Sequence, residues 1–358
     1  MYKIVLLLYF TYLSNFLSAP PNVKKFLLFF IFVFFVFGGS AFAEYTTDFT
    51  LSTPDNKTDI DYTTGKFNNI GEIKIQKTDA SANFEPFKKV VVTVTYSNKL
   101  ENESGSSSVN YKLVAGNEDN GKTINSGETI EFFAASIDAG AGINIGAVIT
   151  GDASTLPDDF YRDKQVSFTA ELKNIEAGDT VQFGTYSGNK LKWRVINDNV
   201  FQTKGYYYFK NIMLITEKAI MSHCYDVKAS GSTWSGSWAQ NWLNGKSGTG
   251  VSAPYFIDGF TEDEKNKIFK ASDNDVNVFL LSVSSANNFT QEQRICYPLT
   301  GNDPVDWWLA DNVAGTTNNI AYVAADGTVN NTTGSDAARS AKYIRPVIFV
   351  TIEKGEMQ

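Results

Sequence analysis

The chain contains few of the residues that build metal centres and catalytic pairs. Its 358 residues include one histidine, His223, and two cysteines, Cys224 and Cys296. Neither cysteine lies in a C-x-x-C spacing or in another spacing typical of metal ligands. A Ser-His-Asp triad would have to use His223, and no Gly-x-Ser-x-Gly motif precedes that histidine. We therefore predict no enzyme activity, no catalytic residue and no cofactor, and we expect His223 to be a partly buried or surface side chain.

Long apolar runs are confined to the N-terminal region. Lys24-Lys25 precedes the twelve-residue apolar run Phe26–Phe37, and an Ala-x-Ala sequence ends at Ala43. These are the three parts of a secretory signal peptide. A membrane-spanning helix needs about 20 residues, and this run is shorter. We predict that residues 1–43 are a signal peptide cleaved after Ala43, and that the protein is secreted or lies at the cell surface.

Two alternatives stay open for this region. The stretch Val5–Phe16 is also apolar, so the two runs together could form a membrane anchor, although Pro20-Pro21 separates them. A start codon at Val23 would leave residues 1–22 untranslated. No cysteine follows Ala43 directly, so the lipid anchor of a bacterial lipoprotein is not expected.

Basic residues are outnumbered by acidic ones. Without residues 1–43 the chain keeps 28 Lys and Arg against 39 Asp and Glu. An acidic surface repels phosphate backbones and anionic membranes, so we expect neither nucleic acid nor a membrane as a partner. The remaining length predicts two domains. In an oxidising compartment Cys224 and Cys296 could form one disulfide, and the alternative is two small buried apolar side chains.

Residues 44–175 lack any long segment of helical periodicity and contain short strand-like runs instead. Apolar and polar residues alternate in Val92-Thr93-Val94-Thr95-Tyr96, for example. Turns rich in Gly, Asn, Ser and Asp separate the runs. The expected strands are Gly71–Gln76, Val90–Tyr96, Val109–Val114, Thr129–Ala134, Ile143–Thr150 and Gln165–Glu171. We predict an N-terminal all-β sandwich over residues 44–175.

Residues 176–358 combine strands with short capped helices, which predicts an α+β domain. Ser237-Trp238-Ala239-Gln240 fits a capping box for a helix that stops at Gly245. Thr261-Glu262-Asp263-Glu264 fits another for a helix over Glu262–Lys270. The expected strands are Thr180–Phe183, Leu191–Ile196, Tyr206–Phe209, Ile212–Thr216, Val278–Ser282, Ile320–Ala324, Thr328–Asn330 and Tyr343–Thr351.

This half also contains short aromatic and aliphatic tags in a specific order. They are Phe183-Gly184, Trp193-Arg194-Val195, Trp242-Leu243-Asn244, Phe279–Ser282, Trp307-Trp308-Leu309 and Arg345-Pro346. Their order over residues 178–354 resembles a family of bacterial, mostly secreted domains of unknown function. Ala310-Asp311 stands where that family has Arg-Ser, and Gln240 stands where an Arg is usual. Any role of those arginines in the family is therefore in doubt here.

The resemblance implies a C-type-lectin-like fold, with two small sheets, two helices and long, loop-rich connections. Formylglycine-generating enzymes share that fold, so a degenerate enzyme of this type is an alternative. The fold does not by itself give a function.

Tryptophans are the first candidates for ligand contact, because an exposed indole stacks on a sugar ring. Trp234, Trp238 and Trp242 recur every four residues, and Trp307 and Trp308 are adjacent. Trp242 and Trp308 fall within the family tags, and we expect them in the core. Trp234 and Trp307 are predicted ligand-binding residues, with core burial as the alternative.

Oxygen-rich loops beside the paired tryptophans are the second candidates. C-type lectins hold Ca²⁺ in such loops, and the ion needs six to eight oxygen ligands. Calcium therefore stays open as a cofactor, and solvated turn residues are the alternative. Asp273-Asn274-Asp275 is a further candidate calcium-binding segment, with solvated turn residues again as the alternative. Arg345 is expected to form a structural ion pair. The candidate residues are Asp303, Asp306, Asp311 and Asn312.

These patterns predict an exported protein that binds an extracellular carbohydrate or protein. The contacts are expected from long loops around residues 226–236 and 298–319 of the C-terminal domain. The alternative is a structural or adhesive cell-surface subunit, in which a pilin-like sandwich assembles and no small ligand is bound.

Overall fold

The computed structural model describes residues 45–54, 60–102, 104–151, 163, 165–228, 231–270 and 277–356. These residues belong to one compact unit that starts at Glu44. The predicted signal peptide, residues 1–43, and Asp273-Asn274-Asp275 lie outside the described residues. Within the described part of the chain, no helix is both long and apolar enough to cross a membrane.

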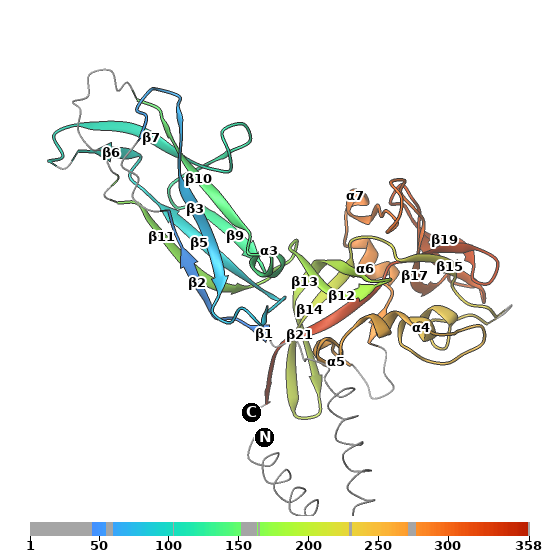
Figure 1. Ribbon diagram of the computed structural model, residues 1–358. Helices are drawn as coiled ribbons and strands as arrows, with labels where there is room; N and C mark the ends of the chain where they lie inside the picture. The colour runs from blue at the N-terminus through green and yellow to red at the C-terminus, as the bar shows by residue number, and fades with distance from the viewer. Residues whose placement is uncertain are drawn as a thin grey trace, which may run out of the picture. The chain divides into compact units, whose positions relative to one another are not determined.

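The N-terminal half consists of two main sheets and a short helix, α3 (Figure 1). The first sheet has the order β2-β3-β10-β7-β6, with β8 paired to β7, and the second has the order β11-β5-β9. A separate two-stranded pair joins β1 to β4. The bounds are β1 (Tyr45–Thr46), β2 (Phe49–Ser52), β3 (Phe67–Lys77), β4 (Asn83–Phe84), β5 (Lys88–Thr95), β6 (Lys99–Glu101), β7 (Ser108–Ala115), β8 (Lys122–Ile124), β9 (Thr129–Phe133), α3 (Ala134–Asp138), β10 (Gly142–Ile149) and β11 (Ser167–Asn174).

Both sheets bury their apolar face in one shared core. On β5, Val90, Val92 and Val94 are fully buried, and Ile73 of β3 and Ile145 of β10 belong to the same cluster. Side chains alternate between the two faces of a strand, so the period-2 pattern of the sequence places these residues inward. All six strands predicted in this half are present, with ends displaced by a few residues. Two sheets on a common core match the predicted sandwich.

The C-terminal half contains two five-stranded sheets, of order β12-β13-β14-β21-β16 and β15-β20-β17-β18-β19. Its strands are β12 (Thr180–Tyr186), β13 (Asn189–Lys204), β14 (Tyr207–Thr216), β15 (Met221–Cys224), β16 (Val278–Phe279), β17 (Trp307–Asn312), β18 (Asn319–Val323), β19 (Val329–Asp336), β20 (Ala341–Ile344) and β21 (Val347–Glu356). Its helices are α4 (Trp238–Leu243), the 3₁₀ turn η1 (Phe256–Gly259), α5 (Glu262–Lys267), α6 (Val283–Asn287) and α7 (Gln291–Arg294). Figure 1 shows β14 beside β21, although they lie far apart in the sequence.

The chain changes sheet at Arg345-Pro346. The sequence predicted one strand over Tyr343–Thr351, and this prediction is wrong, because β20 and β21 belong to different sheets. Proline has no N–H to donate to a ladder, so the strand breaks there. The change of sheet leaves Arg345 at the junction of the two sheets, with 4% of its surface exposed.

The predicted N-caps are observed, with two corrections to the helices and one to a strand. Thr261 and Glu264 form the reciprocal capping box of α5. This helix ends at Lys267 and not at Lys270, because Phe269 donates its N–H to the Phe349 carbonyl oxygen of β21. The Ser237 hydroxyl accepts from the Gln240 N–H as predicted, but the Gln240 side chain accepts from Gly236 and not from Ser237.

The third correction concerns the strand predicted over Val278–Ser282. The strand β16 ends at Phe279, and the Ser282 hydroxyl caps α6 by accepting from the Ser285 N–H. Serine at the N-cap of a helix usually has this role, because its side-chain oxygen accepts a hydrogen bond from a free N–H of the first turn.

A residue of the N-terminal half packs in the core of the C-terminal half. Phe87, which precedes β5, is 3% exposed and belongs to the same cluster as Trp193, Phe183 and Phe260. The ring centroids of Phe87 and Phe183 are 5.0 Å apart in an edge-to-face arrangement. The C-terminal core therefore includes a side chain from before residue 176.

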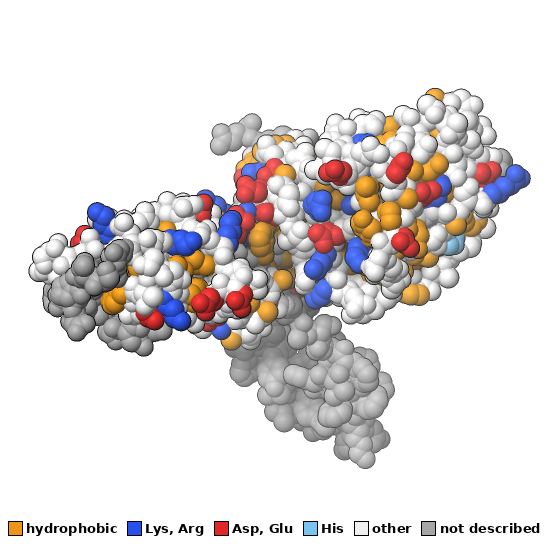
Figure 2. All heavy atoms as spheres, turned by 90° about the horizontal axis from the view of Figure 1, so that it is seen from above, with side chains coloured by type: hydrophobic (Ala, Val, Ile, Leu, Met, Phe, Trp, Pro, Cys, Tyr) orange, Lys and Arg blue, Asp and Glu red, His pale blue; other side chains and the backbone are white. Residues whose placement is uncertain are grey.

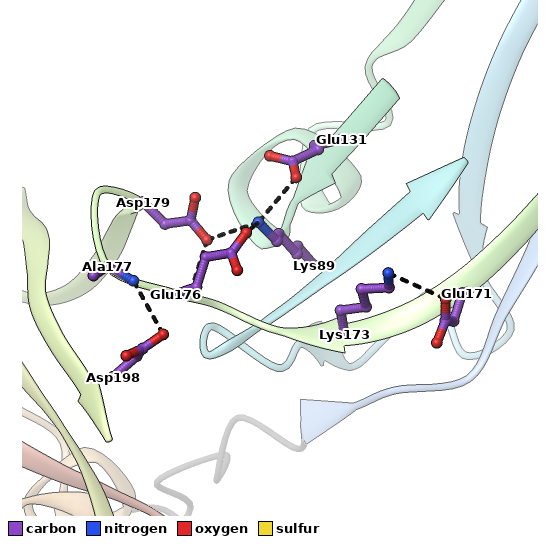
Figure 3. Close-up of polar contacts among 8 residues, drawn as sticks. All are labelled: Lys89, Glu131, Glu171, Lys173, Glu176, Ala177, Asp179 and Asp198. Carbon is purple, nitrogen blue, oxygen red and sulfur yellow. Dashed lines mark hydrogen bonds and ion pairs between the residues drawn. The ribbon is translucent and has the colours of Figure 1, made fainter. Parts of the chain in front are cut away.

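Lys89 joins the two halves by ion pairs (Figure 3). It lies on β5 with 1% of its surface exposed. Its Nζ lies 2.9 Å from Glu131, 3.0 Å from Glu176 and 3.0 Å from Asp179. Burial alone would lower the pKa of Lys89, but the hydrogen bonds to these carboxylates outweigh it and raise the pKa.

Candidate functional site

Five of the six tryptophans donate their indole N–H to a backbone carbonyl oxygen. The pairs are Trp193 with Phe183, Trp238 with Gly250, Trp242 with Pro254, Trp307 with Arg294, and Trp308 with His223. All five are buried. A buried indole usually finds such a partner, because an unpaired N–H in the core is costly. These five tryptophans are structural.

Trp234 differs from the other five. Its side chain is half-buried, and its N–H has no hydrogen-bond partner among the described residues. The ring contacts Tyr225 in a tilted arrangement, with ring centroids 6.2 Å apart. Its carbonyl oxygen accepts from the N–H and the hydroxyl of Ser237, the N-cap of α4. The indole is thus held in place and keeps one unused donor.

Trp307, the other predicted ligand-binding indole, lies in the core. It is 1% exposed, and the guanidinium of Arg345 lies 5.1 Å from its ring centroid. It cannot offer an open face to a sugar ring. An apolar strand position in β17 and a partner carbonyl explain its burial.

The predicted oxygen-rich set is mostly engaged in structural contacts. Asp306 pairs with Lys342 at 2.9 Å and accepts from the Ala325 N–H. Asp311 accepts from the Val283 N–H at the start of α6. Asp303 is exposed. No group of three or more His, Cys, Asp or Glu side chains that could hold a metal ion occurs within the described ranges.

Two of the predicted loops form one surface. The Asn312 side-chain amide donates to the Ser232 carbonyl oxygen at 2.6 Å. The Gly231 N–H donates to the Asn318 side-chain oxygen at 2.8 Å. Residues 231–236 and 312–318 are therefore fixed against each other, and we call them the loop surface. Trp234 lies on it, and Asn312 acts as its brace.

Both cysteines are free thiols, so the disulfide that the sequence allowed is not formed. Cys296 is 1% exposed and belongs to an apolar cluster, as the alternative expected. Burial raises the pKa of both thiols. His223 is half-buried, as predicted, and stacks on Trp238 with ring centroids 3.5 Å apart.

Sequence reasoning missed a cavity of about 230 Å³ in which three arginines meet. Arg194, Arg294 and Arg345 line it, together with Trp307 and apolar side chains. The prediction that Arg345 forms a structural ion pair is wrong: within the described part of the chain no carboxylate pairs with it. The Trp-Arg-Val and Arg-Pro tags were the available signal, because both place an arginine inside an apolar run of the sequence.

Residues 210–352 match the family model of a domain of unknown function, DUF6273. This match agrees with the predicted resemblance to a domain-of-unknown-function family. Trp234, the loop surface, Arg294 and Arg345 lie inside the matched range, whereas Arg194 precedes it. No curated protein and no solved structure matches the chain.

Proposed function

We propose that this protein is an exported binding protein that recognises an extracellular carbohydrate through the loop surface around Trp234. The single observation that carries the proposal is the half-buried indole whose N–H has no partner in the described residues. The proposal includes the signal peptide of residues 1–43 and a C-type-lectin-like arrangement of the C-terminal half.

The chemistry of an indole suits a sugar ring. Its flat apolar face packs on the C–H groups of a pyranose, and its N–H donates to a ring hydroxyl. Thr233 and Ser235, the exposed neighbours of Trp234, supply further hydroxyl groups. The contact with Tyr225 restrains the indole before the ligand arrives, which lowers the entropy cost of binding.

The proposed recognition does not use calcium. Asp306 and Asp311 already contact Lys342 and the α6 N-terminus, so they would have to abandon these bonds to become ligands. A protein partner is the second ligand class that a flat aromatic surface can serve. A protein ligand is favoured if no glycan binds and if Trp234→Ala abolishes binding to a protein partner.

A glycan array with the chain from Glu44 onward tests the proposal. The whole chain is used because Phe87 belongs to the C-terminal core. We expect binding to a subset of glycans, loss of that binding in Trp234→Ala, and no change with chelator. The matched control is Tyr206→Ala, which removes an aromatic ring that is 84% exposed on the β13–β14 hairpin.

Absence of binding to every glycan on the array, combined with concentration-dependent oligomers in analytical ultracentrifugation, would contradict the proposal. That pair of results would favour the structural or adhesive subunit instead.

A further inference from the structure

The arginine cavity gathers positive charge in an acidic protein. The chain has five arginines, one of which, Arg162, is outside the described residues. Of the other four, Arg194, Arg294 and Arg345 line this one cavity. No aspartate or glutamate is among its lining residues. Figure 2 shows the opposite pattern on the face seen from above, where basic and acidic side chains are interspersed.

Arg345 is the most buried of the three arginines that line the cavity. Its Nε donates to the Thr216 carbonyl oxygen at 3.0 Å, and its guanidinium lies over the Trp307 ring. Its two terminal nitrogens have no hydrogen-bond partner among the described residues. Burial lowers the pKa of the guanidinium, and the nearby carboxylate of Glu217 favours its charge without forming an ion pair. Neither terminal nitrogen is among the fully buried polar atoms without a partner, so both remain accessible and can donate to a bound anion.

The other two arginines that line the cavity are Arg294 and Arg194. Arg294 is held rigidly, because its Nε donates to Gly327 and its Nη1 donates to Ala286 and Phe289. Among the described residues, the second terminal nitrogen of Arg294 has no hydrogen-bond partner. Arg194 comes from β13, is half-buried, and forms no side-chain hydrogen bond or ion pair in the described residues. Three arginines from three separate segments of the chain therefore line one space.

Apolar side chains form the rest of the wall. Leu281, Phe289, Ile196 and Ile215 line the cavity beside the arginines. The volume exceeds the roughly 150 Å³ of a protein cavity that binds benzene and falls below the about 300 Å³ at which drug-sized sites begin. The space is right for one small ring or branched chain with a charged end.

We infer that this cavity binds a small organic carboxylate, with the carboxylate on Arg194 and Arg345 and an apolar body against Phe289 and Leu281. A guanidinium fork matches a carboxylate in a bidentate geometry. A carboxylate also sheds its water more cheaply than a phosphate dianion does, which suits a wall that is half apolar. The site is separate from the loop surface and does not depend on the proposed function.

Isothermal titration calorimetry on the chain from Glu44 onward tests this assignment with four probes. We expect saturable binding of phenylacetate and of 4-methylpentanoate, and no binding of phenylacetamide or of inorganic phosphate. The amide keeps the ring of phenylacetate and removes only the charge, so it isolates the contribution of the arginines.

Variants locate the binding. Arg194→Gln should weaken phenylacetate binding roughly tenfold to hundredfold, as expected for loss of a charge-assisted hydrogen-bond donor. Its melting temperature should not change, because the Arg194 side chain forms no hydrogen bond or ion pair with any residue that the structure describes. Arg345→Met should abolish binding. Arg339→Gln, which removes an exposed arginine elsewhere in the same half, should leave binding unchanged.

Equal affinity for phenylacetamide, full binding by Arg194→Gln, or binding of phosphate in place of the carboxylates would each overturn the inference. Absence of heat with both carboxylates would do the same. The loop surface is tested separately: Trp234→Ala should still bind phenylacetate, and Arg194→Gln should still bind the array glycans.

Discussion

Trp307 donates its indole N–H to the Arg294 carbonyl oxygen and supports the Arg345 guanidinium, whereas Trp234 forms neither kind of contact within the part of the chain that the structure describes. Both residues had equal standing in the sequence, because residue type alone does not say where an N–H donor will be satisfied. Burial of five indoles follows from carbonyl groups that other elements bring into reach. Such contacts depend on the tertiary fold, and periodicity along the chain does not encode them.

The contrast predicts effects of different size on stability for the same substitution at the two positions. Trp307→Phe should lower the free energy of unfolding by about 1–3 kcal/mol, because a buried carbonyl loses its donor and a small void remains. Trp234→Phe should change it by less than about 0.5 kcal/mol. Urea denaturation monitored by circular dichroism measures both. Equal losses for the two variants would contradict the assignment of Trp234 to the surface.

Lys89 gives a second prediction at the residue scale. Lys89→Met should destabilise the protein by about 1–2 kcal/mol at pH 7, because Asp179 loses its cation in a mostly buried position, whereas the more exposed Glu131 and Glu176 are hydrated by solvent. Lys173→Met is the matched control: its pair with Glu171 in Figure 3 is exposed at 48% and 71%, so about 0.5 kcal/mol or less is expected.

The Lys89 contribution also depends on pH. The folded state raises the pKa of Lys89 above its ordinary 10.5, so the contribution is complete below pH 10.5. It is lost as the pH rises from there through the folded-state pKa. The stability gap between the wild type and Lys89→Met should therefore stay constant from pH 7 to 9 and shrink above pH 10.5. A gap that grows at alkaline pH would contradict this sign.

Among the elements, α4 links helix capping to the candidate site. The Ser237 hydroxyl accepts from the Gln240 N–H and donates to the Trp234 carbonyl oxygen. The N-cap of α5, Thr261, has the same capping role far from the loop surface. Ser237→Ala and Thr261→Ala should each cost about 1 kcal/mol of stability.

Glycan binding should separate these two caps. We expect weaker binding for Ser237→Ala only, because this variant also frees the Trp234 backbone. Titration of both variants with a glycan that binds on the array provides the measurement. Equal affinity of Ser237→Ala and the wild type would show that the α4 cap does not hold the indole in place.

Elements could be predicted from the sequence where the signal is local. Alternation in Val92–Tyr96 and the Thr261–Glu264 capping box both gave the observed structure. The break at Arg345-Pro346 was missed because an apolar run on both sides looks like one strand. Pairing partners of β20 and β21 lie far away in the sequence, and only those partners reveal that the chain changes sheet there. The arginine cavity was missed for the same reason.

Over the whole molecule, the two halves share interior contacts. Phe87 packs in the C-terminal core, and Lys89 pairs with Glu176 and Asp179. The chain from Glu44 onward should therefore unfold in a single transition in differential scanning calorimetry, with equal calorimetric and van't Hoff enthalpies. Phe87→Ala should lower the melting temperature and preserve the single transition. Two resolved transitions in the wild type would contradict the coupling.

Solvent exchange of the six indole protons, measured by ¹H–¹⁵N NMR, tests the central claim most directly. The claim is that Trp234 is the indole left free for a ligand. The account predicts five slowly exchanging signals and one fast one, and the fast signal disappears in Trp234→Phe. A protected Trp234 proton, or a fast proton on any of the other five tryptophans, would contradict it.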